Sequence, residues 1–292
     1  MGVTFPRKVL IALLCAQFLV PSAIAAPQKI VVGGNRPVTV NLPADVTKPS
    51  PLLIMLHSAS TSGAQQERYM KLGPAAKKLG MIYIAPDGTV GSDGRRVWNA
   101  AKACCQKSGK PVDDIAYINS LIDEIAKKVP VDQSRIYMVG HSNGAFMSIA
   151  FACETGRVAA VVSLAGAMDD DFTCATEKPF AFLQIHGTAD HTIKFGGGAL
   201  NNFSYTSAQQ TLLRVAQSNN CDLESASKGS TAKKDFEPKI AGRETIIENL
   251  KSCQRPTALW RIQGGAHSPS LPVTYAQQIL TFMTQSGEIL SK

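Results

Sequence analysis

The segment "GHSNG", residues 140–144, places a serine between two glycines, where an apolar run ends and a segment of small apolar residues begins. A serine hydroxyl is a poor nucleophile until a base removes its proton, and a sharp strand-to-helix turn can lift the hydroxyl toward that base. Glycines at both ends remove the Cβ atoms that would clash within such a turn. The pattern therefore predicts that Ser142 is a nucleophile, with a tight structural turn as the alternative.

An acid and a histidine follow this serine in the chain order expected for a fold that places its nucleophile on such a strand-to-helix turn. His267 lies in the glycine-rich turn "IQGGAHSPS" after the last apolar run, where a loop could bring the imidazole over the edge of a sheet. Asp190 follows the preceding apolar run in "LQIHGTADHT" and would hold the imidazole in the correct tautomer. We therefore expect Ser142, Asp190 and His267 to form a catalytic triad, with Asp190 as a simple turn residue the alternative.

The tetrahedral intermediate of acyl transfer also needs hydrogen-bond donors for its oxyanion. The amide of Asn143, directly after the nucleophile at a helix N-terminus, is one predicted donor. The second should come from the loop after the apolar run "PLLIML". Within that loop we expect the amide of Ala59 to donate, with Ser58 as the near alternative.

Several other polar or aromatic residues lie close to these segments. His141 lies in the turn itself and is predicted to line the substrate pocket. Trp98, in "RRVWNAAKACC", is predicted either as a wall that contacts substrate or as a packing anchor for the cysteine-rich loop. His57 and His186 end apolar runs and are expected to be structural, whereas His191 is expected to be exposed.

Three consecutive acids, Asp169 to Asp171, are rival carboxylates for the triad. They follow an earlier apolar run than Asp190 does, so a solvated or helix-capping loop is the favoured interpretation. A calcium site is the alternative for these residues.

Six apolar runs of strand length separate segments with helical spacing, which suits strands buried on both faces of a parallel sheet. The runs are residues 51–56, 81–85, 135–139, 159–165, 179–185 and 257–262. The clearest helix is expected from Asp113 to Lys128, where apolar residues recur at intervals of three and four. The alternation predicts an α/β fold with a mostly parallel central sheet and helices on both faces. Residues 29–41 are predicted to form an antiparallel lead-in of two strands around a turn. Residues 222–242 are predicted to form a polar surface excursion.

The first residues resemble an export signal. Arg7 and Lys8 precede an apolar run that ends at Val20, and small residues follow up to Ala25. The run is shorter than the roughly twenty residues that a membrane span needs. We expect residues 1–25 to be a signal peptide and residues 26–292 a single catalytic domain, secreted or periplasmic and without stable membrane insertion. A cytoplasmic protein with a buried N-terminal helix is the alternative.

The formal net charge is +8, with two of these charges on Arg7 and Lys8. The remaining excess is scattered, and its densest cluster, Lys228, Lys233 and Lys234, has no interleaved aromatic residues. A solvated surface is therefore favoured over a nucleic-acid partner. The expected partner is a small-molecule or oligomeric ester substrate, and the sequence specifies no oligomeric state.

Six cysteines follow the predicted signal peptide, and an even count in an exported protein favours disulfides. They are Cys104, Cys105, Cys153, Cys174, Cys221 and Cys253. We expect Cys221 to pair with Cys253. The adjacent Cys104 and Cys105 would be strained if joined to each other, so we expect each of them to pair with one of the other two. A zinc site is the alternative, but no C-x-x-C pair is present.

Seven segments together resemble the secreted polyhydroxybutyrate depolymerase and feruloyl esterase family of α/β-hydrolases. They are "PLLIMLHSAS", "APDGT", "VWNAAKACC", "VDDIAYINSLIDEI", "VDQSRIYMVGHSNGAFMS", "IHGTADHTIKFGGG" and "IQGGAH". The resemblance covers roughly residues 37–283. It implies an α/β-hydrolase fold and a carboxylesterase that needs no metal or organic cofactor. It also places the nucleophile, acid and base on Ser142, Asp190 and His267, the residues chosen above from their spacing.

The chain departs from this family in two places. Ser58 and Ala59 follow His57 where members usually have glycine and cysteine, and Ser268 follows His267 where many have Thr-Trp-Pro. No separate polymer-binding segment is visible, so soluble or short-chain esters are favoured over solid polyester. A peptidase or lipase on the same fold, or a catalytically silent polymer-binding protein, are the alternatives.

Overall fold

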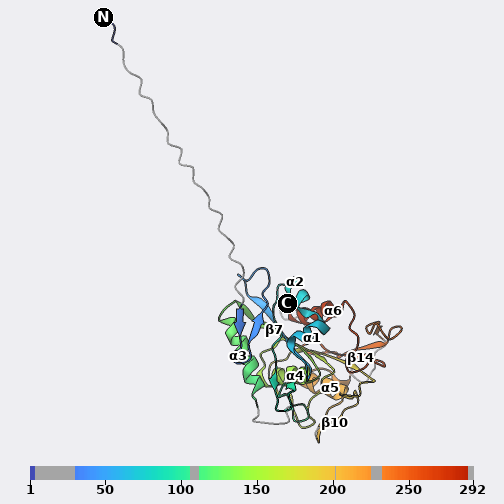
Figure 1. Cartoon of the computed structure of the whole chain (residues 1–292). Helices are drawn as coiled ribbons and strands as arrows, with labels where there is room; N and C mark the ends of the chain where they lie inside the picture. The colour runs from blue at the N-terminus through green and yellow to red at the C-terminus, as the bar shows by residue number, and fades with distance from the viewer. Residues whose placement is uncertain (4–29, 106–111, 201, 225–231, 289–292) are drawn as a thin grey trace.

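The computed structural model describes residues 1–3, 30–105, 112–200, 202–224 and 232–288 (Figure 1). The predicted signal peptide lies almost wholly outside these ranges, so its presence stays a prediction. Lys228 of the expected basic cluster also lies outside them. Within the described ranges, no helix is both long and apolar enough to cross a membrane.

A central sheet of eight strands has the order β12, β13, β14, β9, β8, β7, β3 and β4. In that order the strands are Lys233–Lys234, Thr245–Asn249, Thr257–Ile262, Ala181–Gly187, Ala160–Leu164, Val131–His141, Ser50–Leu56 and Ile82–Ile84. Every neighbouring pair from β14 to β4 is parallel, and β12 and β13 are antiparallel additions at one edge. All six predicted apolar runs lie in strands of this sheet, which confirms the α/β fold class.

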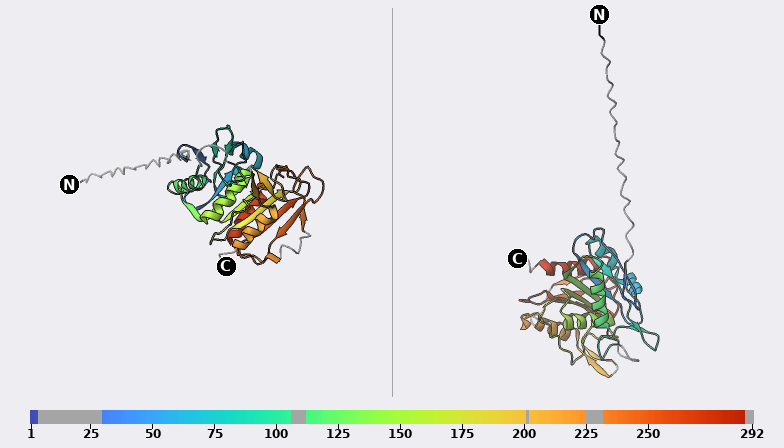
Figure 2. Two further views of the ribbon diagram at one scale, coloured as in Figure 1. Left: turned by 90° about the horizontal axis from the view of Figure 1, so that it is seen from below. Right: turned by 90° about the vertical axis from the view of Figure 1, so that its left-hand side faces the viewer.

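In the described part of the chain, six helices cover the two faces of the sheet (Figure 2). They are α1 (Gly63–Met70), α2 (Leu72–Lys78), α3 (Asp114–Ala126), α4 (Asn143–Thr155), α5 (Ala208–Ser218) and α6 (Tyr275–Glu288). Apolar residues of α3, α4 and α5 join the core on one face, and those of α1, α2 and α6 join the core on the other. The sequence offers Asp113 or Asp114 as the cap of α3, and it is the Asp113 side chain that accepts a hydrogen bond from the amide of Ala116.

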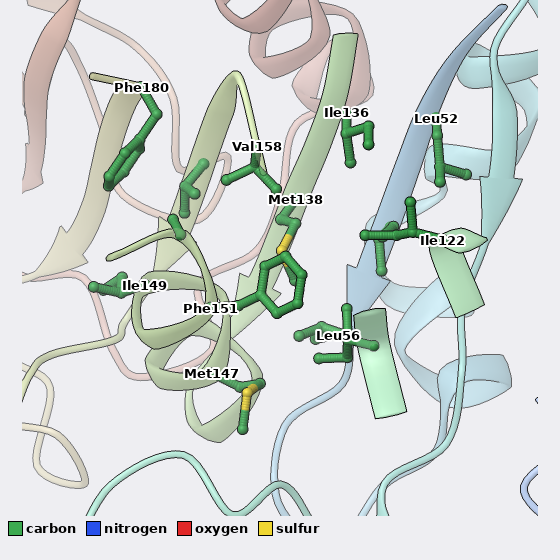
Figure 3. Packing of buried hydrophobic residues seen from close by; sticks show 14 of the residues in the cluster. Leu52, Leu56, Ile122, Ile136, Met138, Met147, Ile149, Phe151, Val158 and Phe180 are labelled. Atoms are coloured by element: carbon green, nitrogen blue, oxygen red, sulfur yellow. The ribbon is translucent and has the colours of Figure 1, made fainter. Parts of the chain in front are cut away.

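Alternating side chains of β3 show how one strand serves both cores. Leu52, Ile54 and Leu56 belong to one cluster, whereas Leu53 and Met55 belong to the other. Figure 3 shows Leu52 and Leu56 within the first cluster, in which α4 packs against the sheet. Burial on both faces explains why the strand has a continuous apolar run.

Three hairpins lie outside the main sheet: β1–β2 (Ile30–Val32 and Val38–Val40), β5–β6 (Thr89–Val90 and Arg96–Val97), and β10–β11 (Gly198–Leu200 and Phe203–Tyr205). The first confirms the predicted antiparallel lead-in. Residues 222–242 differ from the predicted polar surface excursion. Their described part contributes β12, which pairs with β13 and extends the sheet.

Two disulfides join segments that lie close together in the fold. Cys221 pairs with Cys253, as predicted, with their Cα atoms 3.9 Å apart. Cys153, near the end of α4, pairs with Cys174, and their Cα atoms are 4.8 Å apart. Both of these latter cysteines pack at the edge of the same apolar core, so they meet each other rather than the adjacent pair.

The prediction for the adjacent cysteines was therefore wrong, because Cys104 and Cys105 form a disulfide with each other. This pair belongs to a separate small apolar cluster that also contains Phe146 and Tyr205. The prediction assumed that local strain would prevent a bond between two adjacent cysteines. Among the described residues, the other four cysteines pair with each other, and the adjacent two pair between themselves.

Candidate active site

The glycine-flanked serine forms a sharp turn between β7 and α4. Ser142 has φ 54° and ψ −121°, and its hydroxyl makes no capping bond to the helix that it precedes. A Cβ on Gly140 would lie 2.2 Å from the carbonyl oxygen of Gly144, and one on Gly144 would lie 2.3 Å from that of Leu56. Both glycines are therefore required by close backbone approach, as the sequence predicted, and the hydroxyl is left available for another partner.

The three predicted triad residues lie together at the carboxyl edge of the parallel strands, after β7, β9 and β14. The hydroxyl oxygen of Ser142 is 2.9 Å from Nε2 of His267. Nδ1 of the same ring is 2.7 Å from Oδ2 of Asp190. Since a carboxylate only accepts hydrogen bonds, Nδ1 is the protonated nitrogen and Nε2 is free to accept the serine proton.

Asp190 is 3% exposed, and several donors surround its carboxylate. Oδ1 accepts hydrogen bonds from the amides of Thr192 and Ile193, at 2.8 and 2.9 Å. Burial alone would raise the pKa of Asp190, but hydrogen bonds from His186, His267 and the Thr192 amide overcome this effect. Together they hold the pKa well below its ordinary value, so the carboxylate is charged wherever His267 is required to act as a base.

His186 supports this carboxylate from within the core, as the structural role predicted for it requires. The ring is fully buried, and its Nε2 donates to the carbonyl of Ile193 at 2.8 Å and lies 3.3 Å from Oδ2 of Asp190. The side-chain amide of Gln184 donates to its Nδ1 at 3.0 Å. The acid therefore has a fixed position and a fixed set of donors.

The two predicted oxyanion donors have no competing partner. Among the described residues, the backbone amides of Ala59 and Asn143 make no hydrogen bond. The amide of Ser58, the near alternative, donates to Oε1 of Gln66 at 3.2 Å. This contact favours Ala59 over Ser58 as the second donor.

The side chain of Asn143 and the ring of Trp98 link three loops around the nucleophile. Asn143 accepts from the Trp98 amide at 2.7 Å and donates to the Trp98 carbonyl at 2.9 Å. The indole N–H of Trp98 donates to the carbonyl of His57 at 3.1 Å, and Nε2 of His57 accepts from the Gly88 amide at 2.9 Å. His57 thus has the structural role that was predicted.

Two predicted substrate contacts are not supported by the burial of their side chains. Trp98 has no exposed surface, which favours the packing alternative over the substrate wall. His141 is 4% exposed and packs between the rings of Tyr69 and His267. Its Nε2 donates to the carbonyl of His267 at 3.1 Å, so it contacts the loop that carries the base instead of lining a pocket.

The three consecutive acids have separate partners, which contradicts a shared calcium site. Asp169 accepts hydrogen bonds from the amides of Lys102 and Ala103, at 2.6 and 3.0 Å. Asp170 lies 3.9 Å from Arg214, and Asp171 pairs with the Lys102 side chain. Within the described part of the chain, no cluster of three or more His, Cys, Asp or Glu residues could hold a metal ion.

The roles of three residues that hold the site were not predicted. Gln66 accepts a hydrogen bond from the Ser58 amide, and Asp169 accepts one from the Lys102 amide in the loop after Trp98. Tyr69 donates to the carbonyl of Pro269 at 2.6 Å. Gln66 and Tyr69 lie on α1, three residues apart and therefore on one face of the helix. Nothing in the local sequence pattern marks them, because their partners lie far away along the chain.

Comparisons with known proteins find esterases among the similar sequences and structures. The Neurospora crassa feruloyl esterase D is 25% identical over 253 residues, covering 82% of this chain and 76% of that protein. The Piromyces equi feruloyl esterase B is 33% identical over 170 residues, which cover 56% of this chain but 31% of that protein. An acetyl xylan esterase structure from Aspergillus awamori superposes with a TM-score of 0.61 at 14% identity, over 87% of this chain and 98% of that one.

The family model described as phospholipase/carboxylesterase matches residues 47–219, more than half of the chain. Ser142 and Asp190 lie inside this match, and His267 lies beyond it. The predicted resemblance to feruloyl esterases is confirmed by the relatives above, and the polyhydroxybutyrate depolymerase part of it stays a prediction. This protein belongs to the phospholipase/carboxylesterase family of α/β-hydrolases.

Proposed function

We propose that this protein is a secreted serine carboxylesterase that cleaves ester bonds through an acyl-enzyme on Ser142. The observation that carries the proposal is the continuous chain of hydrogen bonds from Ser142 through His267 to Asp190, at 2.9 and 2.7 Å. Such a chain lets a neutral imidazole remove the serine proton as the hydroxyl attacks the ester carbonyl.

Acylation and deacylation use the same three side chains. Ser142 Oγ attacks the carbonyl carbon while Nε2 of His267 takes its proton, and the imidazolium then protonates the departing alcohol. Asp190 stabilises the imidazolium because its own pKa is held low and it stays charged. In the second half, Nε2 takes a proton from water, water oxygen attacks the acyl carbon, and the proton returns to Ser142 as the acid leaves.

The amides of Ala59 and Asn143 are the proposed oxyanion donors. Asn143 is the first residue of α4, where backbone amides lack partners within the helix. The amide of Ala59 lies in the loop after β3, and its neighbour Ser58 is already committed to Gln66. Losing one such donor typically costs about 3 kcal/mol of transition-state stabilisation.

We propose feruloyl-type, short-chain or hydroxyalkanoate-oligomer esters as the substrate class. Feruloyl esterases among the relatives support the first of these, and the shared triad chemistry supports all three. Three disulfides support secretion or a periplasmic location, because such bonds persist in oxidising compartments.

Fluorophosphonate labelling followed by mass spectrometry tests the nucleophile. We expect a single adduct on Ser142 and a loss of at least about 10⁴-fold in kcat for Ser142→Ala, the scale typical of an isolated nucleophile deletion. The matched control is Ser148→Ala, a buried helical serine whose hydroxyl contacts the carbonyl of Gly144 and has no proposed role in catalysis. Full activity in Ser142→Ala would refute the proposal.

A substrate panel then separates the ester classes and the rival functions. Acetyl, butyryl, feruloyl and 3-hydroxybutyrate-oligomer esters should be hydrolysed in a Ser142-dependent manner, and their kcat/KM ratios rank the acyl preference. Preferential turnover of a peptide or a triglyceride would indicate a peptidase or lipase. Retention on plant-polymer fragments without any turnover would indicate a silent binding protein.

A further inference from the structure

The loop of residues 263–270 carries His267 and is called the histidine loop here. Its beginning is fixed by backbone contacts beside β9. The amide of Gly264 donates to the hydroxyl of Thr188 at 2.8 Å, and the amide of Ala189 donates to the carbonyl of Gly265 at 2.9 Å. These bonds precede His267 and leave the part of the loop after it to be held in another way.

Two side-chain donors hold that second part. Nε2 of His141 donates to the carbonyl of His267 at 3.1 Å, and the hydroxyl of Tyr69 donates to the carbonyl of Pro269 at 2.6 Å. The hydroxyl of Ser268 also lies 3.5 Å from Nε2 of His141. Both carbonyls therefore receive a hydrogen bond from a residue that is distant in sequence.

The rings of these residues lie in a row, tilted against each other, that ends on the ring of His267. Tyr69 and His141 have ring centroids 5.5 Å apart, and those of His141 and His267 are 5.3 Å apart. His141 is buried, and its Nδ1 has no hydrogen-bond partner among the described residues. The polar contacts found for its ring all go to the histidine loop, which assigns the ring a role there.

Both donors are neutral at the pH where the base must act. Burial, reinforced by the charge of His267, lowers the pKa of His141 to about 4. Burial also raises the pKa of Tyr69 above its ordinary value, so its hydroxyl keeps its proton. A neutral neighbour does not oppose the positive charge that His267 acquires during turnover.

We propose that His141 and Tyr69 are positioning residues that clamp the histidine loop, keeping Nε2 of His267 within hydrogen-bond distance of Ser142. The inference rests on the proposed function, because it assigns the clamp to the base of that reaction. A displacement of about 1 Å at a reacting group can cost about 100-fold in rate, so two hydrogen bonds to backbone carbonyls suffice to matter.

Three variants test the clamp on the full-length protein. Tyr69→Phe removes one hydroxyl and keeps the ring, and we expect kcat to fall about 10-fold with KM changed less than about twofold. His141→Phe keeps a ring but removes the donor, and kcat should fall about 30- to 100-fold. His141→Gln retains an N–H donor and should restore kcat to within about threefold of the wild type.

Tyr117→Phe is the matched control, because the hydroxyl of Tyr117 also donates to a backbone carbonyl, that of Arg36, at 2.7 Å. This contact joins α3 to the β1–β2 hairpin and not to the histidine loop, so kcat should be unchanged. Thermal unfolding of each variant separates loss of fold from loss of positioning. Tyr69→Phe keeps the test decisive if His141→Phe fails to fold.

The outcomes separate the clamp from the proposed function. If wild-type Ser142 reacts with fluorophosphonate while folded Tyr69→Phe keeps its kcat within twofold, the clamp is refuted and the esterase proposal stands. A rise in KM with unchanged kcat would assign these residues to substrate binding and would also overturn the clamp. If Ser142 itself is unreactive in the wild type, the proposed function fails first.

Discussion

The turn that carries Ser142 and the loop that carries His267 are built in opposite ways. Residues 140–144 form their turn through close backbone approach, of Gly140 to Gly144 within the turn and of Gly144 to the backbone of Leu56 and His57, and the side chains are buried. The histidine loop is held by residues far from it in sequence, including Tyr69, His141 and Asp190. The nucleophile is thus positioned by tight packing of backbone against backbone, whereas the base is positioned by side-chain hydrogen bonds from distant residues.

This difference predicts unequal responses to similar damage. The nucleophile turn has no space to relax, since its glycines touch backbone of β3 and α4. The histidine side chain is 19% exposed, so its loop can move toward solvent. Damage to the turn should therefore appear as lost stability, and damage to the loop as lost activity.

The largest effect on kcat is expected when the hydrogen bond between Asp190 and Nδ1 of His267 is changed. In Asp190→Asn the amide would donate to Nδ1 of His267, forcing the proton onto Nε2, which then could not accept from Ser142. We expect kcat to fall about 10⁴-fold with the fold intact, the scale found for the equivalent change in a serine protease triad. Steady-state hydrolysis of a butyryl ester measures it.

Asp132→Asn is the control for this change, because Asp132 is also hydrogen-bonded to neighbouring side chains but lies at the start of β7, at the other end of the strand from Ser142. Its kcat should stay at the wild-type value. A loss smaller than about tenfold in Asp190→Asn would mean that the position of the base does not depend on this contact.

Gly144→Ala tests the rigid turn. The new Cβ would lie 2.3 Å from the carbonyl oxygen of Leu56 and 2.5 Å from that of His57, both of them backbone atoms. Overpacking of this kind costs about 3 kcal/mol, and more where the backbone cannot shift. Urea unfolding should therefore show a large loss of stability, and a variant with wild-type stability would contradict the control of this turn by close backbone packing.

Gly187→Ala makes the same substitution beneath the histidine loop. Its Cβ would lie 2.1 Å from the carbonyl oxygen of Gly265, so the loop must move away from β9. We expect kcat to fall about 100-fold while stability falls less than in Gly144→Ala, because an exposed loop relaxes more easily than the buried turn. Equal stability losses in the two alanine variants would remove the distinction between the two regions.

Features encoded within one segment were predictable from the sequence. The six apolar runs and the "GHSNG" turn each contain their own signal, as does the Asp113 cap of α3, and the structure places each where it was expected. The edge strands β12 and β13 were missed because they are short and their sequences lack a continuous apolar run. β13 forms by pairing onto β14 and β12 by pairing onto β13, which no local pattern reveals.

Features that depend on a distant partner were predicted less well. The order of Ser142, Asp190 and His267 along the chain was informative because each follows a different parallel strand at one edge of the sheet. The pairing of the adjacent cysteines was misjudged, and two roles stayed open for Trp98, since pairing and burial depend on which loops pack together. The role of Tyr69 had no signal, because its partner is a backbone carbonyl 200 residues away.

The smallest expected effect concerns His141, which belongs to the rigid turn yet contacts the histidine loop. Burial, then the charge of His267, lowers its pKa from 6.5 to about 4, while Asp190 raises it and His186 lowers it to a lesser extent. Between these two values the unfolded chain binds a proton at this site and the folded protein does not. The free energy of unfolding should therefore fall as the pH is lowered through this window, by at most about 1.4 kcal/mol per pH unit.

The variant His141→Gln has no group to titrate at this position, so it should lose about 1 kcal/mol less stability than the wild type between pH 6 and pH 5. His57, whose pKa is also lowered by burial, is present in both proteins and cancels in the comparison. Urea unfolding at the two pH values measures the difference. Parallel losses in both proteins would mean that His141 is protonated in the fold, and a charged ring would then lie against the base that it is proposed to position.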